Sequence, residues 1–384
     1  MTRKVTGLSR INGLSKKRLL EISKKAKDPR RSWGNKKHLL SDILVITLLA
    51  VICDCNSWQE IHDFAVFRHD WLKTFLELPN DIPSRVTFIR FFTFVKPDVL
   101  EDIYREWVRP FVGSLNSKHI CIDGKTIRTA SKFSGSPIHL LSAYVCENYL
   151  SIGQVKTANH SNEITAIPEL LKAFDLTGAT ITIDAIGCQK SIAKLITDSH
   201  GHYILQVKDN QRTLREEVSE FLLWAPTDKI ERKKLSRYTF CTKEHGRITR
   251  WKVLATQDVV WFESIKDWQH LHSFILVERI TTKNEGTSSE ISYYISSLQV
   301  NAKTFSKLIR EHWRVENSLH WVLDVVFDED HCRIHNQFAP QNLNILRKMA
   351  IALLRNNHSF DASLKRKQKF AAYNSDFLLS LFMD

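Results

Sequence analysis

The sequence predicts a mixed α/β protein in which a helical N-terminal region precedes a sheet flanked by helices. The first observation behind this class is a change of apolar period, from helical spacing over residues 38–110 to short β-branched runs after Lys118. The second is the order of the elements after Lys118, which is β-β-β-α-β-α-β-α. This order is typical of a mixed sheet covered by helices.

The composition is that of an ordinary globular protein. The chain has 384 residues, 43% hydrophobic and 25% charged, and this length allows two or three domains. The longest apolar run, residues 43–53, is too short for a bilayer span, which takes about 18 residues. The basic N-terminus lacks the apolar stretch of a secretory signal. We therefore expect a cytoplasmic protein with reduced cysteines, since its seven cysteines form no C-x-x-C pair.

Positive charge is concentrated at the N-terminus. The net charge is +13, and residues 1–37 contain 13 Lys or Arg against two acids. Such a basic arm attracts polyanions and releases their counterions on binding, although a solvated solubility tail has the same composition. We expect a nucleic-acid partner and no membrane partner.

Residues 38–115 are expected to form a helical N-terminal domain that is a candidate for DNA binding. The expected helices span residues 38–54, 58–78, 85–95 and 98–112. Ser84 is a candidate N-cap of the third helix. That helix carries Arg85, Thr87 and Arg90 on an aromatic segment, and it fits a DNA-reading helix and a packed core helix equally well.

The sheet domain is expected in two pieces, residues 116–222 and 301–357. Its strands and helices are expected, in chain order, at 119–124, 138–147, 149–157, 162–174, 179–185, 188–199, 202–208 and 210–223. Short strand-like runs over residues 223–300 predict a β-rich insertion between the pieces. Helices follow within 303–330, where the helix is expected to end before the last three acids, and at 340–356, and residues 358–384 are expected to be a polar C-terminal tail.

Three carboxylates stand at informative places in this scheme. Asp123 and Asp184 each close an apolar strand, and ligands of open α/β sheets gather at the carboxyl ends of strands. A turn-forming aspartate before glycine is the ordinary alternative. At about 100° per residue, Glu316 falls in the middle of the apolar face of the helix at 303–330, where an unpaired carboxylate would lose hydration.

Carboxylates on separate elements favour a hard divalent cation such as Mg²⁺. Two such ions, about 3.5–4 Å apart, activate the attacking oxygen and stabilise the leaving oxygen of an in-line displacement at phosphorus. Together with the basic arm, the three carboxylates predict action on a phosphodiester.

The motifs around these residues resemble a known family, the insertion-sequence DDE transposases that include the H-repeat-associated proteins of bacteria. The stretches that carry the resemblance are "IDGKTIR", "GQVKTANHSNEITAIPELL", "TIDAIGCQK", "LQVKDNQRTL", "YYISSL" and "HWRVENSLHWVLDVVFDED". They occur in one order within residues 28–357.

The resemblance implies a ribonuclease-H-like fold interrupted by a β-rich insertion, with Asp123, Asp184 and Glu316 as the catalytic, metal-binding triad. It implies Mg²⁺, with Mn²⁺ as a substitute, and double-stranded DNA at the element ends and the target. Because two ends must be paired, it also implies a homodimer or higher oligomer. For a bacterial protein of this kind it implies association with the nucleoid.

One feature departs from the related transposases, which carry a Tyr, Arg, Glu, Lys signature around the glutamate. At the required spacings this chain has, besides Glu316, Ile309, His312 and Leu323. The phosphate-contacting Arg and Lys are therefore missing from their usual places. Arg310, Arg314 and Lys348 are the candidates to replace them.

Other residues compete for the third carboxylate position. The downstream acids are Asp324, Asp328, Glu329 and Asp330, of which the last three are expected in a solvated acidic turn. Glu163 is also a candidate, although an acid at a helix N-terminus is common because it complements the helix dipole. A zinc site from His312, Glu316 and His320 is disfavoured, because residues on three successive turns span about 12 Å.

Polar residues that follow strand ends on the expected catalytic edge are candidates for contacts to DNA phosphates, which fix position without reading sequence. They are Lys125, Arg128, Lys208, Asn210 and Gln211, and Arg310 and Arg314 on the late helix join them. Solvated loop residues are the alternative. We expect a DNA transposase in which water and then a DNA 3′-hydroxyl attack phosphorus, without a covalent enzyme intermediate. An inactive relic that only binds DNA and a ribonuclease-H-like nuclease without strand transfer remain alternatives.

Overall fold

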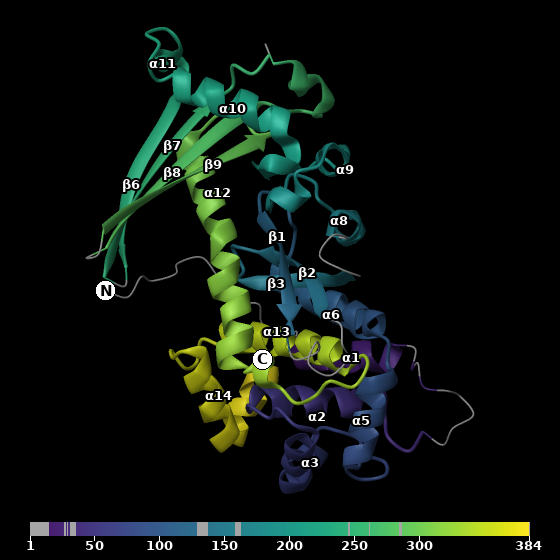
Figure 1. Ribbon diagram of the computed structural model, residues 1–384. Coiled ribbons are helices and arrows are strands. Elements are labelled where there is room, and N and C mark those ends of the chain that lie inside the picture. The colour runs from purple at the N-terminus through teal and green to yellow at the C-terminus, as the bar shows by residue number, and fades with distance from the viewer. Residues whose placement is uncertain are drawn as a thin grey trace.

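The computed structural model describes residues 15–383 except for residues 27, 29, 31–35, 129–136, 158–162, 245, 261 and 284–285. A helical region lies at one end of the molecule and a single large sheet at the other (Figure 1). The expected α/β class is confirmed: within the described residues one mixed sheet has nine strands in the order β3-β2-β1-β4-β5-β9-β8-β7-β6.

The first five strands form the part of the sheet that carries the candidate site. They are β1 (His119–Ile127), β2 (Ile138–Val145), β3 (Leu150–Thr157), β4 (Thr180–Ile183) and β5 (His202–Val207). β1, β4 and β5 are parallel, whereas β2 and β3 are antiparallel to their neighbours. β2 and β3 form the hairpin expected around Asn148, and its turn includes Tyr149 with a φ of 55°.

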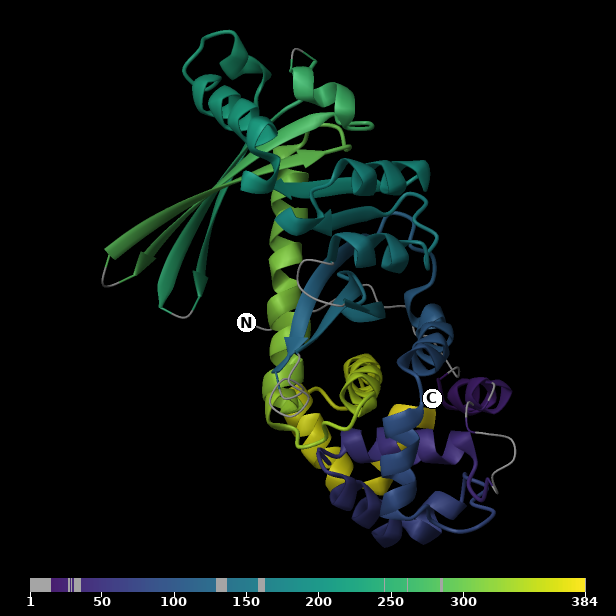
Figure 2. The same ribbon diagram turned by 45° about the vertical axis from the view of Figure 1, so that its right-hand side comes forward.

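Helices cover both faces of this sheet. They are α8 (Glu163–Leu171), α9 (Lys190–Asp198), α10 (Arg212–Trp224) and α12 (Ala302–Val315), whereas the short helix α11 (Glu231–Lys234) buries none of its residues. α12 contacts β1 and β4 and continues along the later strands β6 (Ser236–Glu244) and β7 (Arg247–Thr256), so it crosses most of the sheet (Figure 2). On the other face, Ile183 of β4 lies beside Ile167 of α8 around Gly187.

The predicted β-rich stretch is present, but its strands continue the central sheet. β8 (Ser273–Lys283) and β9 (Gly286–Ser296) complete the four late strands, and β9 pairs antiparallel with β5, with Leu205 opposite Ile295. The distal ends of these hairpins project beyond the body of the protein (Figure 2). The insertion therefore shares backbone hydrogen bonds with the strands beside the candidate site.

The helical region is larger than the sequence predicted. It contains α1 (Ser15–Lys25), α2 (Leu40–Ile52), α3 (Trp58–Phe67), α4 (His69–Lys73), α5 (Arg85–Phe94), α6 (Pro97–Val112), α13 (Ala339–Asn356), α14 (Leu364–Tyr373) and α15 (Ser375–Met383). Ser84 caps α5 as expected, because its side chain accepts a hydrogen bond from the Thr87 N–H. Arg85 and Arg90 are exposed while Phe88 is buried, so a DNA-reading role for α5 stays a prediction.

Two expectations about the ends of the chain were wrong in the described residues. Part of the basic arm is helix α1, whose Leu19 and Ile22 are buried against the helical region. The polar tail is helices α14 and α15, because apolar residues such as Leu378 and Phe382 recur at helical spacing and are buried. Residues 1–14 of the arm lie outside the described residues.

Helix α13 connects the helical region to the sheet. It contacts α2 and α6 on one side and β3 on the other, and it is buried almost throughout. Its polar residues therefore need internal partners: Asn342 donates to the Phe92 and Val95 carbonyls, and Lys348 donates to Ser142 at 2.7 Å.

Candidate active site

Strand register brings Asp123 and Asp184 to the same level of the sheet. β1 and β4 run parallel with Cys121 opposite Thr182 and Ile122 opposite Ile183, so the aspartates follow as the next residues on neighbouring strands, which lie about 4.8 Å apart. Side chains alternate between the faces of a strand. Thr182 contacts α12, and the alternation therefore places both aspartates on the face that α12 covers.

Glu316 reaches the same place by a local irregularity of the late helix. α12 ends at Val315, and π-helical turns follow at Glu316–His320 and Val322–Val326. The assumption of 100° per residue is therefore wrong from Glu316 onward, because a π-turn holds more residues than an α-turn. Glu316 is exposed, so the expectation that burial strips its hydration was also wrong. π-bulges are frequent at functional sites.

The three carboxylates line one cavity of about 310 Å³. The other residues that line it include Thr182, Gln206, Lys208, Tyr294, His312, Trp313 and His320. Its walls come from the middle of β1, from the ends of β4 and β5, from β9 and from the helix that bears Glu316. The sequence patterns did not point to Thr182, Gln206, Tyr294 or Trp313. Thr182 was detectable, because it lies two residues before Asp184 and so shares its face of the strand.

The electrostatics of the cavity are those of crowded acids. Burial raises the pKa of Asp123 to about 6, against the opposing effects of His312 and the Gly124 N–H, and the negative charges of Asp184 and Glu316 raise it further. The charges of Asp184 and Glu316 therefore add to the cost of ionising Asp123. A bound cation would offset that cost.

Two histidines, both neutral, border the carboxylates. Burial lowers the pKa of His312, and it lowers that of His320 to about 3. Nδ1 of His320 lies 3.6 Å from Asp123. His312 Nδ1 is 2.9 Å from the Thr182 hydroxyl, which fixes the orientation of the imidazole.

The donor set fits hard divalent cations, since it consists of carboxylate oxygens on separate elements. Among the described residues, one group of three has its ligand atoms within 4.8 Å of one another, and it consists of His and Cys side chains. The ligand atoms of the three carboxylates are therefore spaced more widely than that. A pair of ions about 3.5–4 Å apart needs a wider spacing than one ion does. The same limit gives no support to a zinc site from His312, Glu316 and His320.

The acids that competed with Glu316 are engaged elsewhere. Asp324 lies 2.6 Å from the Lys125 ammonium, Asp328 pairs with His331, and Asp330 lies 3.8 Å from Arg128. Glu329 was expected in a solvated turn, and that was wrong: it is fully buried. None of these four side chains lines the cavity.

Glu163 occupies a different place again. Its carboxylate packs against Gly124, where a Cβ atom would come within 3.0 Å of its Oε1. Gly124 therefore permits the close approach of α8 to the end of β1. This position explains Glu163 as a packing neighbour of the strand that carries Asp123.

Lys125 is not placed to meet DNA, because it belongs to a buried ion-pair network. Its ammonium lies 2.6 Å from Asp324 and 3.5 Å from Glu329, and 9% of its side chain is exposed. Glu329 is held further by Arg347 at 3.1 Å and by Asn344 at 2.9 Å. Burial alone would lower the pKa of Lys125, but the two acids raise it, so the lysine is charged.

Two further candidates for DNA contacts hold the loop after Asp184. Asn210 donates to the Ala185 carbonyl at 2.7 Å, and Gln211 donates to the Cys188 carbonyl at 3.0 Å. These bonds tie the start of α10 to the turn at Ala185–Gly187. Both residues therefore support the position of Asp184.

The remaining basic candidates differ in their surroundings. Lys208 is exposed and lines the cavity. Arg128 and Arg314 are exposed, whereas the Arg310 guanidinium lies 4.6 Å from the centre of the Phe240 ring. Lys348 is buried in contact with Ser142 and Gln154, so it cannot replace a phosphate-contacting residue.

Comparison with known proteins gives the family. The family described as Transposase DDE domain matches residues 115–353, and the one described as DDE_Tnp_1-associated matches residues 21–108. The first match covers more than half of the chain, and the chain therefore belongs to the DDE transposase family. The resemblance seen in the sequence is confirmed.

Relatives of similar length support the same family. The chain is 39% identical over 355 residues to the putative transposase YncI of Escherichia coli O157:H7, covering 91% of this chain and 90% of that protein. It is 35% identical over 373 residues to the H repeat-associated putative transposase YhhI of Escherichia coli K12, covering 95% and 97%. A short protein of the same strain, named inactive transposase YbfQ, is 38% identical over 74 residues, 19% of this chain and 87% of that protein.

In the part of the chain that the structure describes, no helix combines the length and the apolar character that crossing a bilayer requires.

Proposed function

We propose that this protein is a DNA transposase that cleaves and joins DNA strands with divalent metal ions, Mg²⁺ or Mn²⁺, held by Asp123, Asp184 and Glu316. The observation that carries the proposal is the shared cavity of the three carboxylates, in a chain of the DDE transposase family. The central sheet, with β1, β2 and β3 followed by parallel β4 and β5, is consistent with a ribonuclease-H-like fold.

The chemistry is two displacements at phosphorus. Water attacks a phosphodiester at the element end, the P–O3′ bond breaks, and a free 3′-hydroxyl leaves. That hydroxyl then attacks a target phosphodiester, so one P–O bond forms as another breaks. Bound Mg²⁺ would supply positive charge to both oxygens of each displacement.

The residues of this chain position the reactants. Asp123 is held within β1 at the level where β4 ends before Asp184, and Asn210 and Gln211 hold the loop that follows Asp184. Lys208 is an exposed cation on the cavity wall, and we assign it the contact to a DNA phosphate. His312, which occupies the signature position of the missing arginine, offers a neutral imidazole for hydrogen bonding.

The test is Mg²⁺- or Mn²⁺-dependent nicking and joining of a plasmid that carries the DNA flanking the gene. Wild type is compared with Glu316→Gln, which keeps the shape of the side chain but removes its charge. We expect cleavage to fall by at least about 10³-fold, as for the loss of an essential group, while DNA binding persists. Asp328→Asn, an acid outside the cavity, serves as the matched control and is expected to cleave normally.

Three results would contradict parts of the proposal. Equal cleavage by wild type and Glu316→Gln would mean that another acid binds the metal. Cleavage without new strand junctions would indicate a nuclease that does not transfer strands. DNA binding without cleavage by wild type, on flanks with intact element ends, would favour an inactive relic.

A further inference from the structure

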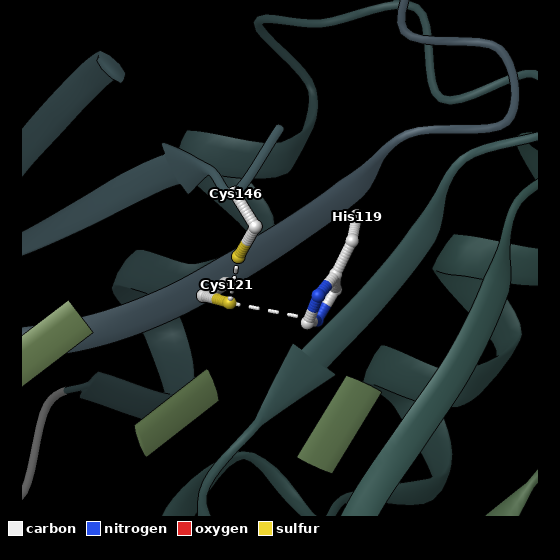
Figure 3. A group of neighbouring side chains, drawn as sticks. All are labelled: His119, Cys121 and Cys146. Atoms are coloured by element: carbon white, nitrogen blue, oxygen red, sulfur yellow. Dashed lines mark hydrogen bonds between the residues drawn. The ribbon is translucent and has the colours of Figure 1, made fainter. Parts of the chain in front are cut away.

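A buried group of soft ligands lies beside the catalytic cavity, on the same face of the sheet. His119 and Cys121 point from one face of β1, and Cys146 follows the end of β2 (Figure 3). Their ligand atoms all lie within 4.8 Å of one another. The side chains are almost inaccessible, with exposures of 1%, 0% and 9%. The Cys146 N–H donates to the His119 carbonyl at 3.0 Å, which holds the two strands together at this level.

The spacing of the three atoms is close to that of a tetrahedral zinc site. With Zn–S near 2.3 Å and Zn–N near 2.05 Å, tetrahedral ligands stand about 3.5 Å apart for N and S and about 3.8 Å for two sulfurs. Nε2 of His119 lies 3.5 Å from Sγ of Cys121. The two sulfurs are 3.0 Å apart, so they would have to separate by about 0.8 Å, which small rotations about the Cα–Cβ bonds can supply.

A carboxylate stands where it would orient the histidine. Oε2 of Glu311 lies 3.4 Å from His119 Nδ1. Histidines that bind metals almost always donate their second ring N–H to such a group. A proton on Nδ1 leaves Nε2, the nitrogen 3.5 Å from Cys121 Sγ, with the lone pair that a metal ion needs. The Thr182 hydroxyl, 2.8 Å from Nε2, offers an oxygen for the fourth position.

We propose that His119, Cys121 and Cys146 form a zinc site that is separate from the carboxylate cavity. Two sulfurs and an imidazole suit Zn²⁺ and discriminate against Mg²⁺, which prefers oxygen. The site joins β1 to the end of β2. Its ligand Cys121 lies two residues before Asp123 on β1. Thr182 also contacts His312 of the cavity wall, so a bound ion would brace the strand and the helix that frame the catalytic cavity.

The test uses the full-length, reduced protein without DNA, so its outcome does not depend on transposase activity. Co²⁺ is titrated as a spectroscopic substitute, because thiolate ligation produces a charge-transfer absorption band that carboxylate ligation does not. Zn²⁺ affinity is then measured by competition with a chromophoric chelator. We expect one Co²⁺ with a thiolate band per chain, displaced by Zn²⁺.

Variants locate the site. Cys121→Ser with Cys146→Ser should abolish the band. Glu311→Gln should keep the band but weaken Zn²⁺ binding about 10- to 100-fold, as expected for loss of an orienting partner. Cys188→Ser, which alters another buried thiol, should bind as wild type does. If the double variant fails to fold, Cys146→Ala, at the less buried of the two thiols, replaces it.

Three results would overturn the proposal. The first is the absence of a thiolate band at stoichiometric Co²⁺, and the second is a band that survives loss of Cys121 and Cys146. The third concerns the alternative chemistry of two neighbouring thiols. If the oxidant diamide forms a Cys121–Cys146 disulfide equally fast with and without Zn²⁺, as measured by counting alkylated thiols, the pair is a redox pair and not a metal site.

Discussion

The buried position of Lys125 makes a quantitative prediction that separates a structural role from a DNA-binding role. Lys125→Met keeps the length and apolar stem of the side chain but removes its charge. Asp324 and Glu329 would then lose the ammonium 2.6 Å and 3.5 Å away. Removing one partner of a buried ion pair typically costs about 3–5 kcal/mol, because the other charge is left uncompensated.

The structure places this variant at the lower end of that range. Glu329 is fully buried but keeps Arg347 and Asn344, and Asp324 is one-third exposed and regains hydration. We therefore expect a loss of about 3 kcal/mol in the free energy of unfolding. At about 2–4 °C per kcal/mol for a domain of this size, the melting temperature should fall by about 6–12 °C.

Thermal unfolding and salt-dependent DNA binding of the same proteins provide the measurement. Arg128→Met is the matched control, because Arg128 is 77% exposed and its ion pair with Asp330 is long. It should change stability by less than about 0.5 kcal/mol. If Lys125 instead contacts a phosphate, Lys125→Met would have the melting temperature of wild type. It would also lower the slope of log DNA affinity against log salt concentration by about one. That result would refute the ion-pair reasoning.

Three further predictions concern the cavity. In metal-free protein the pKa of Asp123 is about 6 in the native state and 3.8 in the unfolded chain, so the free energy of unfolding falls as pH rises between these values. Urea unfolding at pH 7 should find Asp123→Asn about 1–3 kcal/mol more stable than wild type. Equal stability of the two proteins would show that ionised Asp123 does not destabilise the native state. Asn210→Ala releases the Ala185 carbonyl and should slow cleavage about 10- to 100-fold at unchanged DNA affinity, whereas weakened binding would indicate a direct DNA contact. Lys208→Ala should weaken DNA binding and reduce its salt slope by about one, and an unchanged slope would remove Lys208 from the interface.

Sequence patterns were sufficient where structure depends on near neighbours. The end of β4 was predicted because the apolar run stops at Asp184, and the capping of α5 by Ser84 was predicted because a cap bonds within one turn. The expected end of β1 at Asp123 was wrong, because pairing with β2 extends β1 to Ile127. The family followed from six short motifs, each of which is local.

Sequence patterns failed where geometry or burial depends on distant residues. The position of Glu316 was inferred from a uniform helical period, and the π-helical turns change that period. Lys125 and Glu329 read as solvated residues because their neutralising partners, Arg347 among them, are far along the chain. The C-terminal segment was wrongly predicted to be a polar tail, because the apolar side chains of α15 are buried only by packing against other helices.

The sequence by itself therefore determined the α/β class, the family and the identity of the three carboxylates. Only the tertiary structure decided that these carboxylates share one cavity, that the insertion extends the sheet through β5 and β9, and that His119 and Cys121 meet Cys146. The physical reason is that strand pairing and the compensation of buried charge are interactions through space. They join residues whose separation along the chain carries no periodic signal.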